Sequence, residues 1–535
     1  MKYTLWLMAA LVSTLSIQAM ADDCSDLNTL AVEAGDIGLP TRGAVVDSTS
    51  WVNDGSKNAG NDVCRVRGHI KPVTNNGFAI HFQVNLPKKW NEKSLHVGGG
   101  GFNGVLIEAN KHYTAQPTSE LTPLQQGFAT YGSDSGHQSK INFDGRFMLN
   151  EEALLNFGHQ QLKKTHDVAQ RIIETFYGRA TNYRYFIGGS QGGHEAFDVV
   201  QRFPSDYHGV IAGYPAHNEV MLHLSANVYA RALLDNDGAG WLNPAKVETF
   251  VAEIYSACDS LDGAEDGIIS NSAACAERTL PFSGYDESNP VRCANGKDTG
   301  NNCLSDAQIR ALNIINSPLQ LDFSIFPDDE GNTVFPGWTP FVGSTFFDAN
   351  FPNLGGEGPH QALQAMPGDA TLRYAIARDI SIEPLKGFDP NKYAGRITDL
   401  AGLMSANSSN IDAFQQARGK LIFFHGSVDD FIPVTSSIDY WQRLQKRYPT
   451  ESLSEFVKFY VIPGMGHVTG PFKARMATFD ALQAWVERGQ VPATLTAIDE
   501  NPATKGRTRP VCEFPLWPKY KGGDINQASS FQCSK

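Results

Sequence analysis

The stretch that decides the fold runs Tyr183-Arg184-Tyr185-Phe186-Ile187-Gly188-Gly189-Ser190-Gln191-Gly192. Its first half has the aromatic and β-branched pattern of a buried strand, and residues 193–203 continue as a helix-like stretch. A strand, a sharp turn carrying a serine and a helix are the context of a nucleophile elbow. The small glycines at 188 and 192 let the chain pass through such a turn. Ser190 is therefore a candidate nucleophile.

Apolar runs on both sides of this stretch predict further buried strands. They lie at 79–86, 95–97, 128–131, 210–212, 421–424 and 456–462. Residues 156–177 have apolar positions roughly on one face, and this pattern predicts a helix between strands. Strands that alternate with helices indicate an α/β sheet.

The pattern breaks after Pro215. Residues from about 217 to about 400 are rich in Gly, Pro, Asn and Asp and have few strand signals. We interpret 22–216 and 401–535 as two parts of one catalytic domain, with 217–400 inserted between them as a lid.

The N-terminus has the pattern of a secretory signal peptide over residues 1–21. Lys2 is positive, residues 5–17 are apolar, and Ala19-Met20-Ala21 is a small-x-small cleavage site. No later segment of the sequence is apolar enough to cross a bilayer. We therefore expect a secreted or periplasmic protein without a membrane span. The net charge of −13 argues against nucleic acid as a partner, and the sequence leaves the oligomeric state open.

Eight cysteines in a secreted chain suggest disulfides. None of them has metal-site spacing with histidine. The plausible local pairs are Cys24 with Cys64, Cys258 with Cys275, Cys293 with Cys303, and Cys512 with Cys533.

A serine nucleophile needs a base and an acid that orients the base, and in this kind of fold the acid precedes the histidine along the chain. His467 ends the glycine-rich run Pro463-Gly464-Met465-Gly466-His467, which follows a predicted strand. Asp429 and Asp430 both follow the predicted strand 421–424, and spacing alone does not choose between them.

Four consecutive glycines, Gly98 to Gly101, follow another predicted strand. Glycines let backbone N–H groups approach a substrate oxygen, as a site for a developing oxyanion requires. The N–H of Gln191, next after the candidate nucleophile, would be the second donor.

An acidic loop follows Cys258 and contains Asp259, Asp262 and Asp266. Oxygen-rich loops with glycine turns suit Ca²⁺, although the spacing here is not that of an EF-hand. From composition alone, a solvated acidic turn is an equal alternative.

These motifs together resemble the tannase and feruloyl esterase family, which includes hydrolases of mono(2-hydroxyethyl) terephthalate. The stretches that carry the resemblance are 98–104, 133–137, 177–216, 258–275, 426–433 and 463–467. The resemblance implies an α/β-hydrolase fold with a large inserted lid, and it matches the four cysteine pairs to the family's outer disulfides. The site residues that it implies are a triad of Ser190, Asp429 and His467, oxyanion donors at Gly100 and Gln191, and a lid Ca²⁺ site made by the carboxylates of Asp259, Asp262 and Asp266 with the carbonyls of Ala264 and Ile268.

The chain departs from the family pattern beside the triad. The family usually carries two cysteines, just before the nucleophile and just after the base, that are bonded to each other. Here these positions hold Gly189 and Val468. In the lid, Arg373-Tyr374, Trp338 and Phe346-Phe347 are candidates for substrate contact or for lid core.

The function that these expectations favour is a secreted serine carboxylic ester hydrolase. Its substrate would be a small ester of an aromatic acid, of the feruloyl, galloyl or terephthalate monoester type, cleaved through an acyl-enzyme. Two alternatives stay open: an amidase or peptidase with the same triad, and a non-catalytic Ca²⁺-dependent binder.

Overall fold

The computed structural model of the chain describes residues 23–55, 62–325, 333–344, 347–348, 351–352, 365–467 and 469–535. The predicted signal peptide, Phe346 and Val468 lie outside the described residues.

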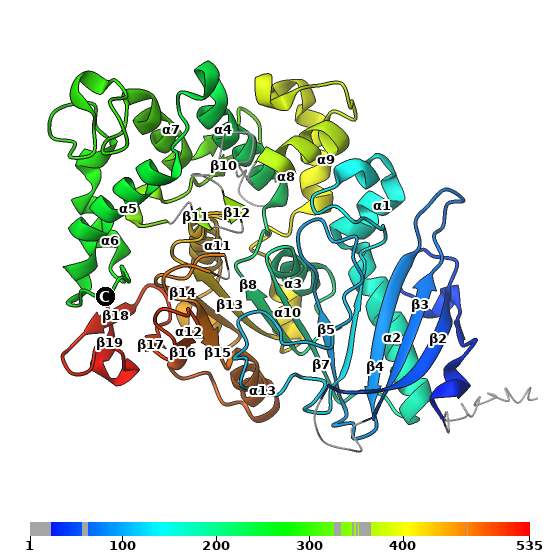
Figure 1. The fold of residues 1–535 in the computed structure, drawn as a ribbon. Helices are drawn as coiled ribbons and strands as arrows, with labels where there is room; N and C mark the ends of the chain where they lie inside the picture. Colours follow the sequence, from blue (N-terminus) through cyan, green and yellow to red (C-terminus); the bar gives the residue numbers. More distant parts are fainter. Residues whose placement is uncertain are drawn as a thin grey trace, which may run out of the picture.

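A ten-stranded sheet forms the centre of the molecule, in the order β1-β2-β3-β4-β6-β5-β7-β8-β13-β14 (Figure 1). The strands from β1 to β6 in this order pair antiparallel, and those from β6 to β14 pair parallel. Their bounds are β1 (Ala31–Val32), β2 (Ala44–Asn53), β3 (Asp62–Ile70), β4 (Ile80–Pro87), β5 (Lys93–Val97), β6 (Ala129–Ser133), β7 (Tyr183–Gly189), β8 (Gly209–Gly213), β13 (Lys420–Gly426) and β14 (Val457–Ile462). All seven strands predicted from the sequence are present, so the α/β prediction is confirmed.

Helices cover both faces of the parallel half of the sheet, which explains why its strands are continuous apolar runs. On one face, Tyr185 and Ile187 of β7 share a buried cluster with residues of α13 (Thr478–Arg488). On the other face, Phe186 packs in a cluster with residues of α3 (Gln191–Arg202) and α11 (Val434–Arg447). Successive residues of a strand point to opposite faces, and both faces are buried here.

The predicted helix over 156–177 is a π-helical turn (Asn156–Gln160) followed by α2 (Gln161–Tyr177). It ends at Gly178, whose φ of +68° is the left-handed conformation typical of a helix C-terminus. One face of α2 packs against β2, β3 and β4. The short helices α1 (Glu151–Leu155), α10 (Asp412–Gln416) and α12 (Thr450–Ser454) complete the helices outside the insertion.

A helical lid formed by α4 to α9 lies between β8 and β13 in the chain and is drawn green to yellow above the sheet in Figure 1. Its helices are α4 (Glu219–Gly238), α5 (Pro244–Cys258), α6 (Ser272–Arg278), α7 (Asp306–Asn316), α8 (Ala365–Ala370) and α9 (Ala394–Met404). Two short strand pairs join them: β9 (Leu319–Gln320) with β10 (Val334–Phe335), and β11 (Phe347–Asp348) with β12 (Phe351–Pro352).

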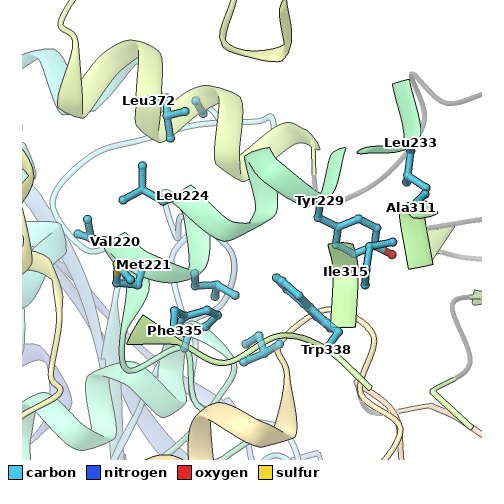
Figure 2. Close-up of a cluster of buried hydrophobic side chains, with 14 of the residues drawn as sticks. Val220, Met221, Leu224, Tyr229, Leu233, Ala311, Ile315, Phe335, Trp338 and Leu372 are labelled. Carbon is cyan, nitrogen blue, oxygen red and sulfur yellow. The ribbon is translucent and has the colours of Figure 1, made fainter. Parts of the chain in front are cut away.

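The lid has a hydrophobic core of its own. Figure 2 shows side chains from α4 and α7 gathered around Phe335 and Trp338, with the rings of Tyr229 and Trp338 5.3 Å apart. Trp338 is 1% exposed, so it belongs to the lid core and not to a substrate wall. Arg373 is engaged within the lid by Asp369 at 3.0 Å.

The C-terminal segment adds two small sheets beside the main one. They are β15 (Ala474–Met476), β16 (Leu495–Asp499) and β17 (Thr508–Val511), and the hairpin of β18 (Trp517–Tyr520) and β19 (Phe531–Ser534). All four predicted disulfides are present, with Cα–Cα distances from 4.9 to 5.5 Å. Among the helices in the described ranges, none is long and apolar enough to span a bilayer.

Candidate active site

Ser190 lies on a strained turn between β7 and α3. Its backbone has φ of +61° and ψ of −120°, a conformation that non-glycine residues rarely adopt. The turn is so tight that a Cβ at Gly188 would lie 2.2 Å from the carbonyl oxygen of Gly192. The glycines on both sides of the serine therefore provide room for the elbow, as predicted from the sequence.

The structure brings the three predicted triad residues together. The Nε2 of His467 lies 3.0 Å from the Oγ of Ser190, and its Nδ1 lies 2.9 Å from a carboxylate oxygen of Asp429. Asp429 is 1% exposed, whereas the His467 side chain is 20% exposed. The arrangement is that of a catalytic triad, in which a buried carboxylate orients an imidazole that lies against a hydroxyl.

Asp429 is held by more than the histidine. Its second oxygen accepts hydrogen bonds from the backbone N–H groups of Phe431 and Ile432, both at 2.9 Å. Burial opposes its ionisation, but the charges and hydrogen bonds of His467 and His425 outweigh burial and hold the pKa of Asp429 below its usual range. Asp429, rather than its neighbour Asp430, faces the histidine.

The glycine loop packs against the N-terminus of α3. The N–H of Gly192 donates to the carbonyl of Gly99 at 3.1 Å. Among the described residues, no protein acceptor takes a hydrogen bond from the N–H of Gly100 or of Gln191, and a Cβ at Gly100 would meet nothing within 4 Å. These two N–H groups are thus free to act as the predicted oxyanion donors.

Glu195 of α3 holds this loop from behind. One of its oxygens accepts from the N–H of Gly99 at 2.8 Å, and the other accepts from the side-chain amide of Asn103 at 2.6 Å. Burial raises the pKa of Glu195 to about 7, although these hydrogen bonds oppose the rise. Glu195 is not among the residues predicted from the sequence, even though it lies five residues after Ser190.

A cavity of about 1140 Å³ opens over Ser190 and His467. Its walls include the glycine loop, residues 105–116 and two aromatic rings, Phe143 and Phe431. The ring of Phe431 lies 5.2 Å from the imidazole of His467 and 5.8 Å from the ring of Phe143. These two aromatic residues line the cavity in place of Trp338. They could not be predicted from the sequence because they lie in loops far apart in the chain.

The acidic loop begins next to the Cys258–Cys275 disulfide. Burial raises the pKa of Asp262 to about 6 and also raises that of Asp259, whereas Asp266 pairs with Arg509. The only three His, Cys, Asp or Glu ligand atoms found within 4.8 Å of one another in the described part of the chain are those of His166, Asp167 and Asp206.

Two backbone carbonyls in the acidic loop have no hydrogen-bond donor. Ala264 and Ile268 are 4% and 1% exposed, and neither carbonyl accepts a hydrogen bond from the described residues. Buried carbonyls without partners are rare because each costs free energy. Carboxylate and carbonyl oxygens are the ligand type that Ca²⁺ prefers, and the two carbonyls without donors are the observation here that is compatible with such an ion.

The comparisons with known proteins agree with this geometry. The family model described as tannase and feruloyl esterase matches residues 64–534. An uncharacterized esterase of Agrobacterium fabrum is 33% identical over 97% of this chain and 94% of its own length. The mono(2-hydroxyethyl) terephthalate hydrolase of Piscinibacter sakaiensis is 29% identical over 94% of this chain and 90% of its own. The crystal structure of an esterase from Aspergillus oryzae superposes with a TM-score of 0.76 at 25% identity, covering 94% of this chain and 98% of that one.

The fold and the site define a carboxylic ester hydrolase with an α/β-hydrolase core and a lid. The chain belongs to the tannase and feruloyl esterase family.

Proposed function

We propose that this protein is a secreted serine esterase that cleaves small esters of aromatic acids through an acyl-enzyme. The observation that carries the proposal is the hydrogen-bonded triad of Asp429, His467 and Ser190 at the wall of the cavity. A serine on a strained elbow, next to an imidazole whose orientation a buried carboxylate fixes, is the arrangement that activates a hydroxyl for acyl transfer.

The reaction would run in two halves. In the first, Nε2 of His467 takes the proton of Ser190 as the Oγ attacks the ester carbonyl, and the N–H groups of Gly100 and Gln191 stabilise the oxyanion. The tetrahedral intermediate then collapses, and His467 returns the proton to the departing alcohol. In the second half, His467 takes a proton from the water that attacks the acyl-enzyme, and it returns this proton to the Oγ of Ser190 as the acid leaves, which restores the free enzyme.

Two features support an aromatic acyl group. Phe143 and Phe431 line the cavity and offer ring surfaces for a planar substrate. The names of the family and of the Piscinibacter relative refer to feruloyl and terephthalate esters, which are esters of aromatic acids.

The test is a panel of esters with the purified enzyme and with Ser190→Ala. The panel contains methyl ferulate, methyl gallate, mono(2-hydroxyethyl) terephthalate, p-nitrophenyl acetate and an anilide of the best acid. We expect one aromatic ester to give the highest kcat/KM, and Ser190→Ala to lose nearly all of it with the fold intact. Retention of more than a few per cent of the activity by Ser190→Ala would contradict the mechanism, and faster cleavage of the anilide would favour an amidase.

The proposal includes a structural Ca²⁺ ion in the lid. Asp259, Asp262 and Asp266 would supply carboxylates, and Ala264 and Ile268 would supply carbonyls. The buried carbonyls without donors and the buried carboxylate of Asp262 support this assignment. The ion would balance the charge of the loop and fix the lid, away from the reacting atoms.

Export from the cytoplasm is part of the same proposal. The apolar segment and cleavage pattern at the N-terminus support it. The four disulfides support it as well, because such bonds persist in oxidising compartments. Mass spectrometry of the mature protein from culture medium and periplasm would identify both the compartment and the first residue.

A further inference from the structure

A buried tyrosine lies against the candidate base. Tyr214 follows directly after β8 and is 4% exposed. Its ring centroid lies 4.7 Å from that of His467, with the planes at 66°, an edge-to-face contact. The ring of Phe431 packs against the same imidazole, with the two ring centroids 5.2 Å apart. The imidazole is therefore confined by two rings as well as by Asp429.

Both ends of Tyr214 are fixed. Its backbone N–H donates to the carbonyl of Phe424 at 2.6 Å, and its hydroxyl hydrogen-bonds to the hydroxyl of Thr114. Its φ of +33° is unusual for a residue with a side chain, and such strain persists only where the surroundings hold the residue. Burial raises the pKa of Tyr214 to about 12, so the hydroxyl stays protonated at neutral pH.

Gly189 provides the room for this pair. A Cβ at residue 189 would lie 2.7 Å from the Tyr214 hydroxyl and 2.7 Å from the Thr114 hydroxyl. The φ of Gly189 is not in the left-handed region, so its backbone conformation is open to other residues. The residue before the nucleophile is thus free of a side chain because Tyr214 and Thr114 occupy the space.

We propose that Tyr214 and Thr114 form a positioning pair that holds the imidazole of His467 over Ser190. Thr114 fixes the Tyr214 ring, and the ring limits rotation and drift of His467 on its glycine-rich loop. The inference rests on the proposed serine mechanism. Neither residue exchanges a proton with the substrate; the pair acts through the geometry of the base.

The test compares variants that remove the hydrogen bond between the pair. Thr114→Val keeps the shape and loses the hydroxyl, Thr114→Ser keeps the hydroxyl, and Tyr214→Phe keeps the ring. For p-nitrophenyl acetate we expect Thr114→Val and Tyr214→Phe each to lower kcat by roughly 10-fold, less than the ~100-fold that a 1 Å misplacement can cost. KM should stay within about 2-fold because the proposed role acts on the base; Thr114 and Tyr214 both line the cavity, so a rise in KM would instead mark a substrate contact. The double variant should be no slower than either single variant, and Thr114→Ser should recover most of the kcat lost in Thr114→Val.

The matched control is Tyr520→Phe, which removes a hydroxyl that donates to the Gly523 carbonyl at 2.7 Å in the C-terminal segment. It should leave kcat unchanged. Tyr214→Leu removes the ring as well and should lower kcat further; if it does not fold, the other variants carry the test.

Several results would overturn the inference. The first is an unchanged kcat in Thr114→Val and Tyr214→Phe. The second is a loss of kcat in the double variant that equals the product of the two single losses. The third is a rise in KM that accounts for the whole loss in kcat/KM, which would make Tyr214 a residue that contacts the substrate. Ser190→Ala separates the two proposals. If Ser190→Ala is inactive and the pair variants are fully active, only the positioning role fails; if Ser190→Ala is active, the serine mechanism fails.

Discussion

The Nε2 of His467 lies 3.0 Å from the Oγ of Ser190, although 277 positions separate the two residues along the chain. The order of the strands in the sheet explains why the two side chains lie close together. Ser190 follows β7, Asp429 lies just beyond β13, and His467 lies just beyond β14, and these strands are parallel members of one sheet. Because the carboxyl ends of parallel strands share one edge, loops that are distant in sequence converge there.

Asp429→Asn tests the orientation of the base. The amide would present a donor where His467 Nδ1 needs an acceptor, and the imidazole would take the wrong tautomer. We expect kcat/KM for p-nitrophenyl acetate to fall roughly 10³- to 10⁴-fold. The matched control is Asp430→Asn, which changes the neighbouring carboxylate in the cavity wall and should cost far less. A larger loss in the control than in Asp429→Asn would reverse the assignment.

Glu195→Gln tests the buried carboxylate behind the glycine loop. The pKa of Glu195 is raised from 4.5 to about 7 in the folded state by burial. A raised pKa means that the contribution of Glu195 to stability is complete below pH ~4.5 and is lost as the pH rises through ~7. The free energy of unfolding of the wild type should therefore fall, relative to that of Glu195→Gln, by roughly 2 kcal/mol between pH 5 and pH 8.

Urea titrations at fixed calcium and with intact disulfides would measure that difference. Glu287→Gln, at an exposed position of the lid, is the matched control. Glu195→Gln should also lower kcat, because a glutamine can offer an acceptor to Gly99 or to Asn103 but not to both. An identical pH slope in the wild type and Glu195→Gln would contradict the assigned pKa.

Removal of calcium should destabilise the lid. An ion that binds only the native state stabilises it by about 2.7 kcal/mol at a concentration 100 times Kd. Addition of EGTA should therefore lower the Tm by several degrees, and restored Ca²⁺ should reverse the change. Asp262→Asn should have a low Tm that no longer responds to EGTA, whereas Asp286→Asn, at an exposed lid aspartate, should respond like the wild type. Elemental analysis that finds far less than one calcium ion per molecule in protein purified without chelator would exclude the ion.

The sequence predicted the parallel half of the sheet because buried strands are apolar on both faces, as in β7 and β13. It missed β2, where most residues are exposed or half-buried and polar residues such as Ser48 and Thr49 weaken the pattern. The short strands β15 to β19 have three to five residues each, too few for a period to appear.

The site divides in the same way. The motifs around Ser190 and His467 are local, so they could be predicted, and the structure brings both together with Asp429. Thr114 and Tyr214 are 100 positions apart and make their contact only in the fold. No local pattern in the sequence marks such a pair. In the structure, the pair explains why the residue before the nucleophile is a glycine although its φ is not left-handed.

A cysteine at residue 189 should impair the enzyme. The family pattern of paired cysteines at positions 189 and 468 would suggest that Gly189→Cys with Val468→Cys adds a stabilising bond. The space at residue 189 argues otherwise, because any Cβ there would come within 2.7 Å of the hydroxyls of Tyr214 and Thr114. A contact this short must displace the pair, and overpacking of a filled site typically costs about 1–3 kcal/mol.

We therefore expect Gly189→Ala, Gly189→Cys and the double cysteine variant all to lower kcat by more than 10-fold and to lower the Tm. Gly395→Ala is the matched control, because a Cβ there would meet nothing within 4 Å, and it should leave both quantities close to the wild type. The measurements are kcat with p-nitrophenyl acetate, the Tm, and thiol titration of the double variant under oxidising conditions. The prediction would be wrong if the double variant forms the disulfide, keeps the wild-type kcat and inactivates at a higher temperature. That result would show that the side chains of Tyr214 and Thr114 can be displaced without loss of activity. In that case the packing of Tyr214 and Thr114 would not require a glycine at position 189.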